Sequence, residues 1–460
     1  MTSPASDPPP ENSRPTYELP DDQRPSSATP TEQQLEKETP TAPAAEHDPY
    51  AALRIPMYWF YIMSYCVAVI GGQIQSTAID WELYQRTHSA FMLGMLGAVQ
   101  FLPIALLSLP AGQAADTFDR RRILLIGQLL LALWGVCMAI NSHWLGASGH
   151  THLFTAVALG ILMCNSITLA FARPCRASIL PHIVPTKFFS NAVTWNSSLF
   201  EIACVVGPAL GGFIIRFGTP VAYIANAVAL IGCFLLALPL PKVKVRSQQS
   251  ANLKSLLAGV RFVFATDLLL STMSLDLFAV LLGGAVYLLP IFANDILHVG
   301  STGFGWLRAA PALGAMSMAM LVAHAPPMKH AGRNMLMAVA GFGAATLVFG
   351  LSRNYWLSLA MLFLTGAFDN ISVVVRHTLV QLLTPDEMRG RVSAVNQVFI
   401  GSSNELGGLE SGLTAAWWGA TTSVIFGGIG TLVVVTMIAL KWPSVRKLGR
   451  MDDLEPVKVN

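Results

Sequence analysis

Most of this chain consists of apolar segments that are each about as long as a membrane is thick. Of its 460 residues, 53% are hydrophobic and 12% are charged. A helix needs about 20 apolar residues to cross the hydrocarbon core of a bilayer. Segments of that kind lie near residues 57–79, 91–111, 123–141, 153–172, 192–215, 220–240, 269–292, 303–324, 334–351, 356–377, 393–415 and 420–440. The sequence therefore predicts an all-α membrane protein with twelve transmembrane helices.

The spacing of these segments predicts two bundles of six helices. The longest interruption separates the first six segments from the last six, and its stretch LKSLLAGVRFVF has apolar residues at helical spacing. We expect this stretch to form an amphipathic helix at the membrane interface. The predicted parts are a tail at 1–50, an N-terminal bundle at 51–240, a central cytoplasmic loop at 241–268, a C-terminal bundle at 269–441 and a tail at 442–460.

The first 50 residues differ from the rest in composition. They contain eleven prolines, ten acidic residues and three basic residues, which gives a net charge of −7, whereas residues 51–460 carry +10. A segment with so few large aliphatic side chains cannot bury enough apolar surface to offset the entropy of ordering. We expect it to be a disordered, acidic, Pro-rich tail.

Basic residues gather in alternate loops. The loops on one side carry most of the lysines and arginines, and the opposite loops carry only Arg86, Arg216 and Arg353. Because positive charge accumulates in cytoplasmic loops, both termini and the central loop are predicted to be cytoplasmic. The predicted location is the cell membrane, specifically the inner membrane of a bacterium.

An internal repeat supports two related halves. Arg176 begins the run RASILPHIVPTKFFSNAV before the fifth segment, and Arg376 begins RHTLVQLLTPDEMRGRVSAV before the eleventh. Each arginine is followed at the same spacing by a proline, Pro185 in one half and Pro385 in the other. Such a repeat is typical of transporters that are built from duplicated helix bundles.

A short polar hairpin, LPAGQAADTFDRRR, connects the second and third segments. Its pattern of glycine, aspartates and arginines resembles the loop between helices 2 and 3 of the major facilitator superfamily of secondary transporters. The resemblance implies a gating role, whereas a simple topology anchor is the alternative. The candidate gating residues are Gly112, Asp116, Asp119, Arg120, Arg121 and Arg122.

The stretch from about 57 to 440 is similar to the branch of that superfamily that includes enterobactin exporters and related efflux proteins. The runs AIDWELYQRTHSA, LRAAPALGA and SSNELGGLESG carry this resemblance. It implies the major facilitator fold and an exporter driven by an ion gradient, usually of protons. Two departures are Thr117, where the superfamily has arginine, and the matching loop PPMKHAGRNML, which lacks an aspartate. Siderophores, macrolides and lipophilic cationic drugs all stay open as cargo.

Several polar and charged side chains fall inside the predicted helices. A charge at membrane depth is costly unless it faces a partner or a polar cavity, so each is a functional candidate. All of them lie on segments that the resemblance assigns to the central cavity or its neighbours. The candidates for coupling and substrate binding are Gln75, Gln100, Glu201, Asp276, Arg308, Asp369, Asn370, Asn404, Glu405 and Glu410.

Different roles are expected for these side chains. Glu201 and Asp369 share their depth with no basic residue, and a carboxylate in a low-dielectric cavity readily takes up a proton. Arg308 and Glu410 lie at comparable depth, so an ion pair is expected, and a hydrophobic neutral or cationic cargo would then be favoured. An Arg308 that met the substrate would instead favour an anionic cargo. Asp276 lies near the inner surface, where it could be solvated.

Other classes of protein lack support in the sequence. It contains no HExxH, no nucleophile elbow, no GxxxxGK[ST] and no His/Cys cluster, and its six cysteines form no CxxC pair. We therefore expect a transporter and not an enzyme, without cofactor or metal and without nucleic acid. Its expected partners are a small-molecule substrate, protons and the lipid bilayer, and it is expected to be a monomer. Uptake by the same fold stays open, as does a transport-inactive sensor or scaffold.

Overall fold

The computed structural model describes residues 48–242, 253–326 and 328–451, and these residues form helices and connecting turns without a strand. The first half contains α2 (Pro56–Thr87), α3 (Ala90–Thr117), α4 (Arg120–Ala147), α5 (Thr151–Ile183), α6 (Thr186–Ile214), η2 (Ile215–Phe217) and α7 (Thr219–Ala237). The second half contains α9 (Asp267–Leu282), η3 (Ala285–Leu288), α10 (Leu289–Ile291), η4 (Phe292–Ile296), α11 (Gly300–His324), α12 (Ala331–Leu351), α13 (Tyr355–Leu383), α14 (Asp386–Trp418) and α15 (Ala420–Lys441). The helices α8 (Leu253–Ala265) and α16 (Pro443–Lys447) complete the described chain. The acidic tail predicted at 1–50 lies almost wholly outside the described residues.

Eleven spans in the described chain are long and apolar enough to cross a bilayer. The remaining long helix, α14, has 33 residues but also six charged side chains, so its composition is too polar to qualify on its own. It packs among the other spans, against α3 and α9. The expected all-α membrane fold is therefore confirmed, with eleven spans that qualify by composition and α14 as a further long helix packed among them.

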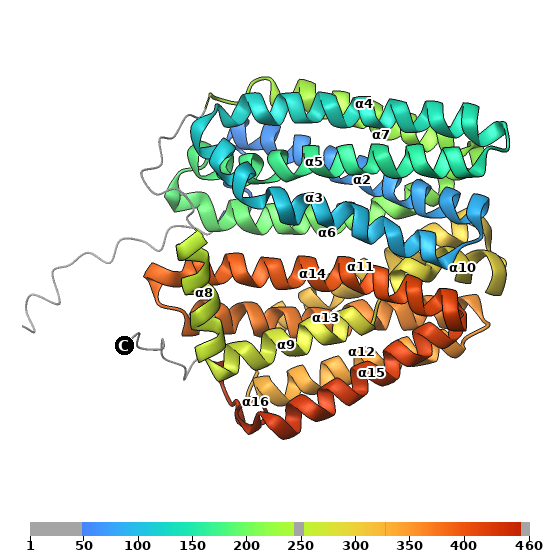
Figure 1. The fold of residues 1–460 in the computed structure, drawn as a ribbon. Helices are drawn as coiled ribbons and strands as arrows, with labels where there is room; N and C mark the ends of the chain where they lie inside the picture. The colour runs from blue at the N-terminus through green and yellow to red at the C-terminus, as the bar shows by residue number, and fades with distance from the viewer. Residues whose placement is uncertain (1–47, 243–252, 327, 452–460) are drawn as a thin grey trace, which may run out of the picture. The chain divides into compact units, whose positions relative to one another are not determined.

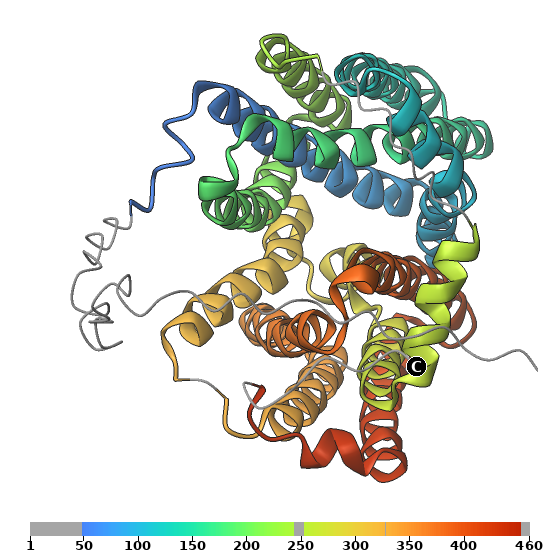
Figure 2. The same ribbon diagram turned by 90° about the vertical axis from the view of Figure 1, so that its left-hand side faces the viewer.

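The long helices are arranged as two groups. Figure 1 shows α2–α7 in its upper half and α9–α15 in its lower half, and Figure 2 shows the same two groups end-on. The groups meet mainly where α3 packs on α14 and where α6 packs on α11. We call the end that holds α8 and α16 the linker end, and the opposite end, where α2 finishes and η4 lies, the far end (Figure 1).

Matching turns relate the two halves. Pro185 precedes α6 with φ −57° and ψ 146°, and Pro385 precedes α14 with φ −56° and ψ 147°. Gly218 and Gly419 then make the turns before α7 and α15 with φ of 113° and 85°, a region that L side chains rarely adopt. The repeated prolines in the sequence thus mark equivalent helix starts.

The seventh membrane segment is not one continuous helix as the sequence suggested. α9 ends at Leu282, and the chain passes through Gly283 and Gly284 into η3 and two further short turns. The backbone of α14 lies close to this break, since a Cβ on Gly284 would be 2.7 Å from the carbonyl oxygen of Gly407. Glycine allows that approach, and the ladder of helical hydrogen bonds is interrupted there.

The first membrane helix is longer than predicted. The apolar run suggested an end near residue 79, whereas α2 continues to Thr87. Asp80 and Glu82 therefore lie inside the helix and are buried. Their burial requires partners on neighbouring helices.

Candidate functional site

An ion pair joins the two halves near the far end. The guanidinium of Arg308 on α11 donates to the Asp80 carboxylate on α2, and its Nη2 also donates to Ser76 Oγ at 2.8 Å. The side chains of Arg308 and Asp80 are 15% and 9% exposed. The expected pair between Arg308 and Glu410 is therefore wrong, because α2 brings Asp80 closer to the guanidinium than α14 brings Glu410.

Further contacts close the far end. The Tyr84 hydroxyl donates to Asp295, and Gln85 Nε2 donates to Asn294 Oδ1 at 2.6 Å. The rings of Trp81 and Phe304 stack, with centroids 5.5 Å apart. These contacts tie the last turns of α2 to η4 and α11.

Glycines bring the helix backbones together at the same end. A Cβ on Gly94 of α3 would lie 2.9 Å from Gly412 Cα on α14, and one on Gly212 of α6 would lie 2.7 Å from Gly305 Cα on α11. Such close approach of small residues is a common way to pack helices in a membrane. Both contacts seal the halves against each other at the far end.

Two carboxylates lie near each other across the halves. Glu201 on α6 and Asp369 on α13 are close enough to interact electrostatically, and both are half-buried. Among the described residues, neither has a hydrogen-bond or ion-pair partner. The sequence prediction that these two acids lack a basic partner agrees with this geometry.

A third carboxylate inside the membrane helices, Glu405, lies on α14. It accepts a hydrogen bond from the Tyr287 hydroxyl at 3.0 Å, and Tyr287 comes from η3, directly after the break in α9. Its carboxylate also interacts electrostatically with Arg308 and Asp80. The hydrogen bond from Tyr287 therefore links the broken helix to α14.

Asp276 is not solvated. The guanidinium of Arg376 on α13 is paired with the Asp276 carboxylate on α9, and their side chains are 3% and 6% exposed. In the first half, the Cζ atom of Arg176 lies 5.2 Å from the ring centroid of Tyr65. Tyr65 on α2 and Asp276 on α9 occupy equivalent positions, because each lies equally far from the start of its helix. The repeated arginines thus contact equivalent helices, and Arg376 is a buried cation that the sequence analysis did not count among the candidate residues.

The other predicted cavity residues have varied surroundings. Gln75 is buried and accepts a hydrogen bond from Asn226 within the first half. Asn404 donates to Ile400 O at 2.9 Å. Glu410 lies near Ser411 Oγ at 3.4 Å, while Gln100 and Asn370 are half-buried on α3 and α13. Of this group, only Asn404 lies with Asp369 on the wall of one cavity.

A buried carboxylate that the sequence analysis missed lies in the first half. Glu82 accepts hydrogen bonds from Arg86 Nε at 2.8 Å, Ser142 Oγ at 2.5 Å and Tyr223 OH at 2.8 Å. These bonds join α2, α4 and α7. Continuing the helical period beyond residue 79 would have placed Glu82 inside the helix.

The polar hairpin caps helices. Asp119 accepts from Arg121 N at 3.0 Å and begins α4. Arg120 is buried, and its Nε and Nη1 donate to Ala115 O and Ser178 O at 2.9 and 3.3 Å. Arg121 donates to Leu238 O, Arg122 Nε lies 3.9 Å from Asp119 Oδ2, and a Cβ on Gly112 would meet no atom within 4 Å. The side chain of Asp116 lies outside what the structure describes.

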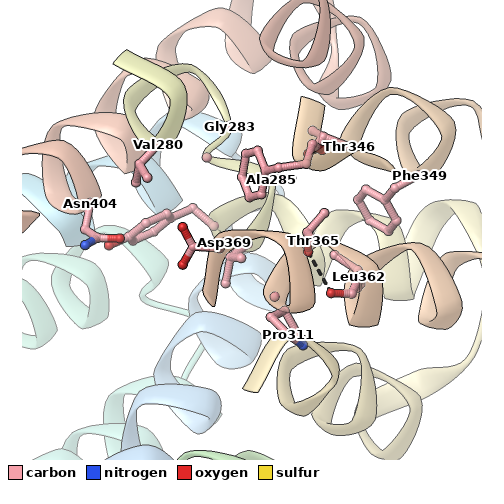
Figure 3. A pocket seen from close by; sticks show the side chains of 15 residues that line it. Val280, Gly283, Ala285, Pro311, Thr346, Phe349, Leu362, Thr365, Asp369 and Asn404 are labelled. Carbon is pink, nitrogen blue, oxygen red and sulfur yellow. Dashed lines mark hydrogen bonds between the residues drawn. The ribbon is translucent and has the colours of Figure 1, made fainter. Parts of the chain in front are cut away.

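A cavity of about 240 Å³ opens at the break in α9. Figure 3 shows Asp369 on its wall, with Asn404 and Val280 to one side and Thr346, Phe349 and Leu362 to the other. The lining residues come from the second half. No cluster of three or more metal-ligating side chains occurs in the described chain.

The fold and this arrangement define a membrane transporter of the major facilitator type. Residues 47–457 match the family described as transmembrane secretion effector, and the chain belongs to that family. It is therefore a multi-pass membrane transporter and not an enzyme.

Curated relatives are distant but cover most of the chain. The staphyloferrin A transporter of Staphylococcus aureus is 23% identical over 397 residues, which cover 82% of this chain and 94% of the relative. The enterobactin exporter of Shigella boydii is 23% identical over 400 residues, which cover 85% and 93%. The chain thus spans nearly the whole length of both relatives.

Solved structures show the same fold. A POT family transporter in complex with 5-aminolevulinic acid has a TM-score of 0.67 at 12% identity, covering 85% of this chain and 96% of that one. A bacterial homologue of the iron transporter ferroportin in an inward-facing state has a TM-score of 0.66 at 13% identity, covering 86% and 100%. At these identities the likeness concerns the fold alone.

Proposed function

We propose that the protein is a proton-coupled exporter that moves a small hydrophobic molecule by alternating access. The observation that carries this proposal is that Glu201 and Asp369, one acid from each half, are half-buried without hydrogen-bond or ion-pair partners among the described residues and interact electrostatically. Two nearby carboxylates repel each other when both are ionised, so one of them readily holds a proton. Motion of the halves would separate them and release it.

The closed far end supports the inward-facing state. The basic loops predict that the linker end is cytoplasmic. Closure by Arg308, Asp80 and the aromatic pair would then seal the side away from the cytoplasm. Export requires these contacts to open once cargo has bound from the inside.

The cargo class follows from the charges. Arg308 is bonded to Asp80 and Arg376 to Asp276, whereas Glu201 and Asp369 have no such partners in the described chain. A hydrophobic cation or a neutral molecule is therefore the proposed cargo. The named relatives carry staphyloferrin A and enterobactin, so a siderophore-type cargo is the competing possibility.

An accumulation assay in an efflux-deficient bacterial host tests this function. Ethidium, erythromycin and a catecholate siderophore would be supplied with and without a protonophore. Expression should lower accumulation of ethidium or erythromycin, and the protonophore should cancel the effect. Greater accumulation on expression would indicate uptake, and insensitivity to the protonophore would exclude protons as the driving ion.

Single variants test the coupling step. Glu201→Gln, Asp369→Asn and Glu405→Gln should be compared with Glu387→Gln, which changes an exposed glutamate at the start of α14. At least one of the three should abolish gradient-driven export, while Glu387→Gln should keep it. Wild-type export by all three would rule out coupling through these carboxylates.

A further inference from the structure

The cavity in the second half lies at the break in α9, where the helical hydrogen-bond ladder of the backbone is interrupted. Gly283, Gly284 and Ala285 line it, together with Tyr287 from the following turn. Inside a bilayer, interrupted helix backbone is tolerated where it is buried in protein or lines a cavity. The break in α9 thus coincides with a cavity, as a binding site formed by a discontinuous helix would require.

The hydroxyl groups of this cavity have already used their hydrogens. The Thr346 hydroxyl donates to Phe342 O at 2.9 Å, and the Thr365 hydroxyl donates to Leu362 O at 2.6 Å. A hydroxyl that donates within its own helix presents only its oxygen lone pairs to a ligand. Both threonines are therefore acceptors.

The other polar side chains of the cavity also offer hydrogen-bond acceptors. The Tyr287 hydroxyl donates to Glu405, so its hydrogen is also in use. One hydrogen of the Asn404 amide is directed to Ile400 O, which leaves its Oδ1 to accept and one amide hydrogen to donate. Asp369 adds a carboxylate that has no bonded partner among the described residues (Figure 3).

We propose that this cavity binds the protonated amine end of the cargo, with the ammonium group against Asp369 and a ring or branched hydrocarbon against Phe342 and Phe349. The inference rests on the proposed transport function and specifies its cargo. An ammonium group supplies up to three donors to a wall of acceptors, and aromatic rings attract a cation further. A carboxylate or catecholate end would find few donors there, and its buried charge would stay unpaired.

The size of the cavity restricts what it holds. Pockets for whole drug-sized ligands usually have about 300–1,000 Å³, and this cavity has about 240 Å³. It therefore accommodates an amine and one ring, and the rest of a larger cargo would extend toward Glu201 in the other half.

Equilibrium binding to the purified full-length protein in nanodiscs tests the inference. The probes are 4-phenylbutylamine, 4-phenylbutanol and 4-phenylbutyrate, which differ only at the polar end, and calorimetry measures their Kd. The amine should bind at least about tenfold more tightly than the carboxylate. Equal affinity for the two, or no binding of the amine, would overturn the proposal.

Variants locate the binding. Asp369→Asn should weaken the amine about tenfold or more, and Val280→Phe, which narrows the cavity without touching the charge, should weaken the amine and the alcohol alike. Thr346→Val should weaken the amine more than its matched control, Thr272→Val. Thr272 is also buried and also donates within its own helix, but it lies outside the cavity.

The binding affinities of the variants test the amine site, whereas transport measurements test proton coupling. Wild-type affinity in both Asp369→Asn and Val280→Phe would place the amine elsewhere and overturn the site. If Asp369→Asn does not fold, Val280→Phe alone decides. Amine binding without gradient-driven transport would leave this site standing and reject proton coupling, whereas coupled export without amine binding would do the reverse.

Discussion

The guanidinium of Arg308 and the carboxylate of Asp80 form an ion pair between the first helix of one half and the second long helix of the other. This pair lies with the Trp81–Phe304 stack at the end where the halves are closed. Separation of the two halves at this end would break the pair, because its two charges come from different halves.

The first prediction concerns this ion pair. Asp80→Asn should leave Arg308 without its counter-charge and favour opening of the far end. Spin labels at Trp144 and Trp417, both exposed near that end, should report an added population at longer distance. The measurement requires a background in which the six native cysteines are replaced.

Charge reversal provides the control. Arg308→Glu should disrupt closure, and Asp80→Arg in the same chain should restore the closed distance. Glu410→Arg should give no rescue, because Glu410 is not the partner. Rescue by Glu410→Arg instead would show that the pairing described here is wrong.

A second prediction concerns the buried pair of Asp276 and Arg376. Asp276→Asn leaves a buried guanidinium unpaired, which costs about 3–5 kcal/mol. Thermal unfolding in detergent should show a clear fall in midpoint. Asp386→Asn is the matched control, because Asp386 is 85% exposed in its pair with Arg389 and such pairs contribute about 0–1 kcal/mol. Equal midpoints for the two variants would contradict the burial argument.

A third prediction concerns the hairpin between α3 and α4. Asp116→Asn should reduce transport severely while the protein still inserts in the membrane, since the superfamily resemblance implies a gating role for this aspartate. Asp119→Asn should retain transport, because asparagine also caps a helix well. Export and membrane content of both variants should be measured together. Normal export by Asp116→Asn would remove the gating role.

A fourth prediction concerns Gly332, which lies in the run PPMKHAGRNML at the start of α12. Leu448 O and Gly449 O accept from the backbone nitrogens of Gly332 and Ala331 at 3.3 and 3.1 Å, so the segment after α15 lies against the start of α12. A Cβ at Gly332 would collide with the carbonyl group of Val445. Gly332→Ala should therefore loosen this segment and expose it to protease.

The control for that experiment is another helical glycine. Gly232 on α7 has open space where a Cβ would stand. Gly232→Ala should leave proteolysis at the C-terminal segment unchanged. Equal resistance of Gly332→Ala and the wild type would show that the close contact does not hold the segment.

Local patterns in the sequence predicted most of the helices. A membrane helix must satisfy its backbone internally and present apolar side chains to lipid, so its signal is contained in about 20 consecutive residues. The repeated Pro185 and Pro385 likewise marked equivalent helix starts, because proline restricts the backbone where it stands. The same reasoning failed at Gly283 and Gly284, since apolar residues continue across the break in α9.

The sequence by itself determined the membrane class, most of the long helices and the relation between the two halves. Counting 1.5 Å per residue gives the depth of a side chain along its helix, and on depth alone Arg308 and Glu410 looked like partners. Only the tertiary structure decided that Arg308 meets Asp80, that Arg376 meets Asp276 and that Asp369 faces a cavity. The physical reason is that a partner depends on which helix stands opposite and on how each helix is rotated, and both are set by packing between residues far apart in the chain.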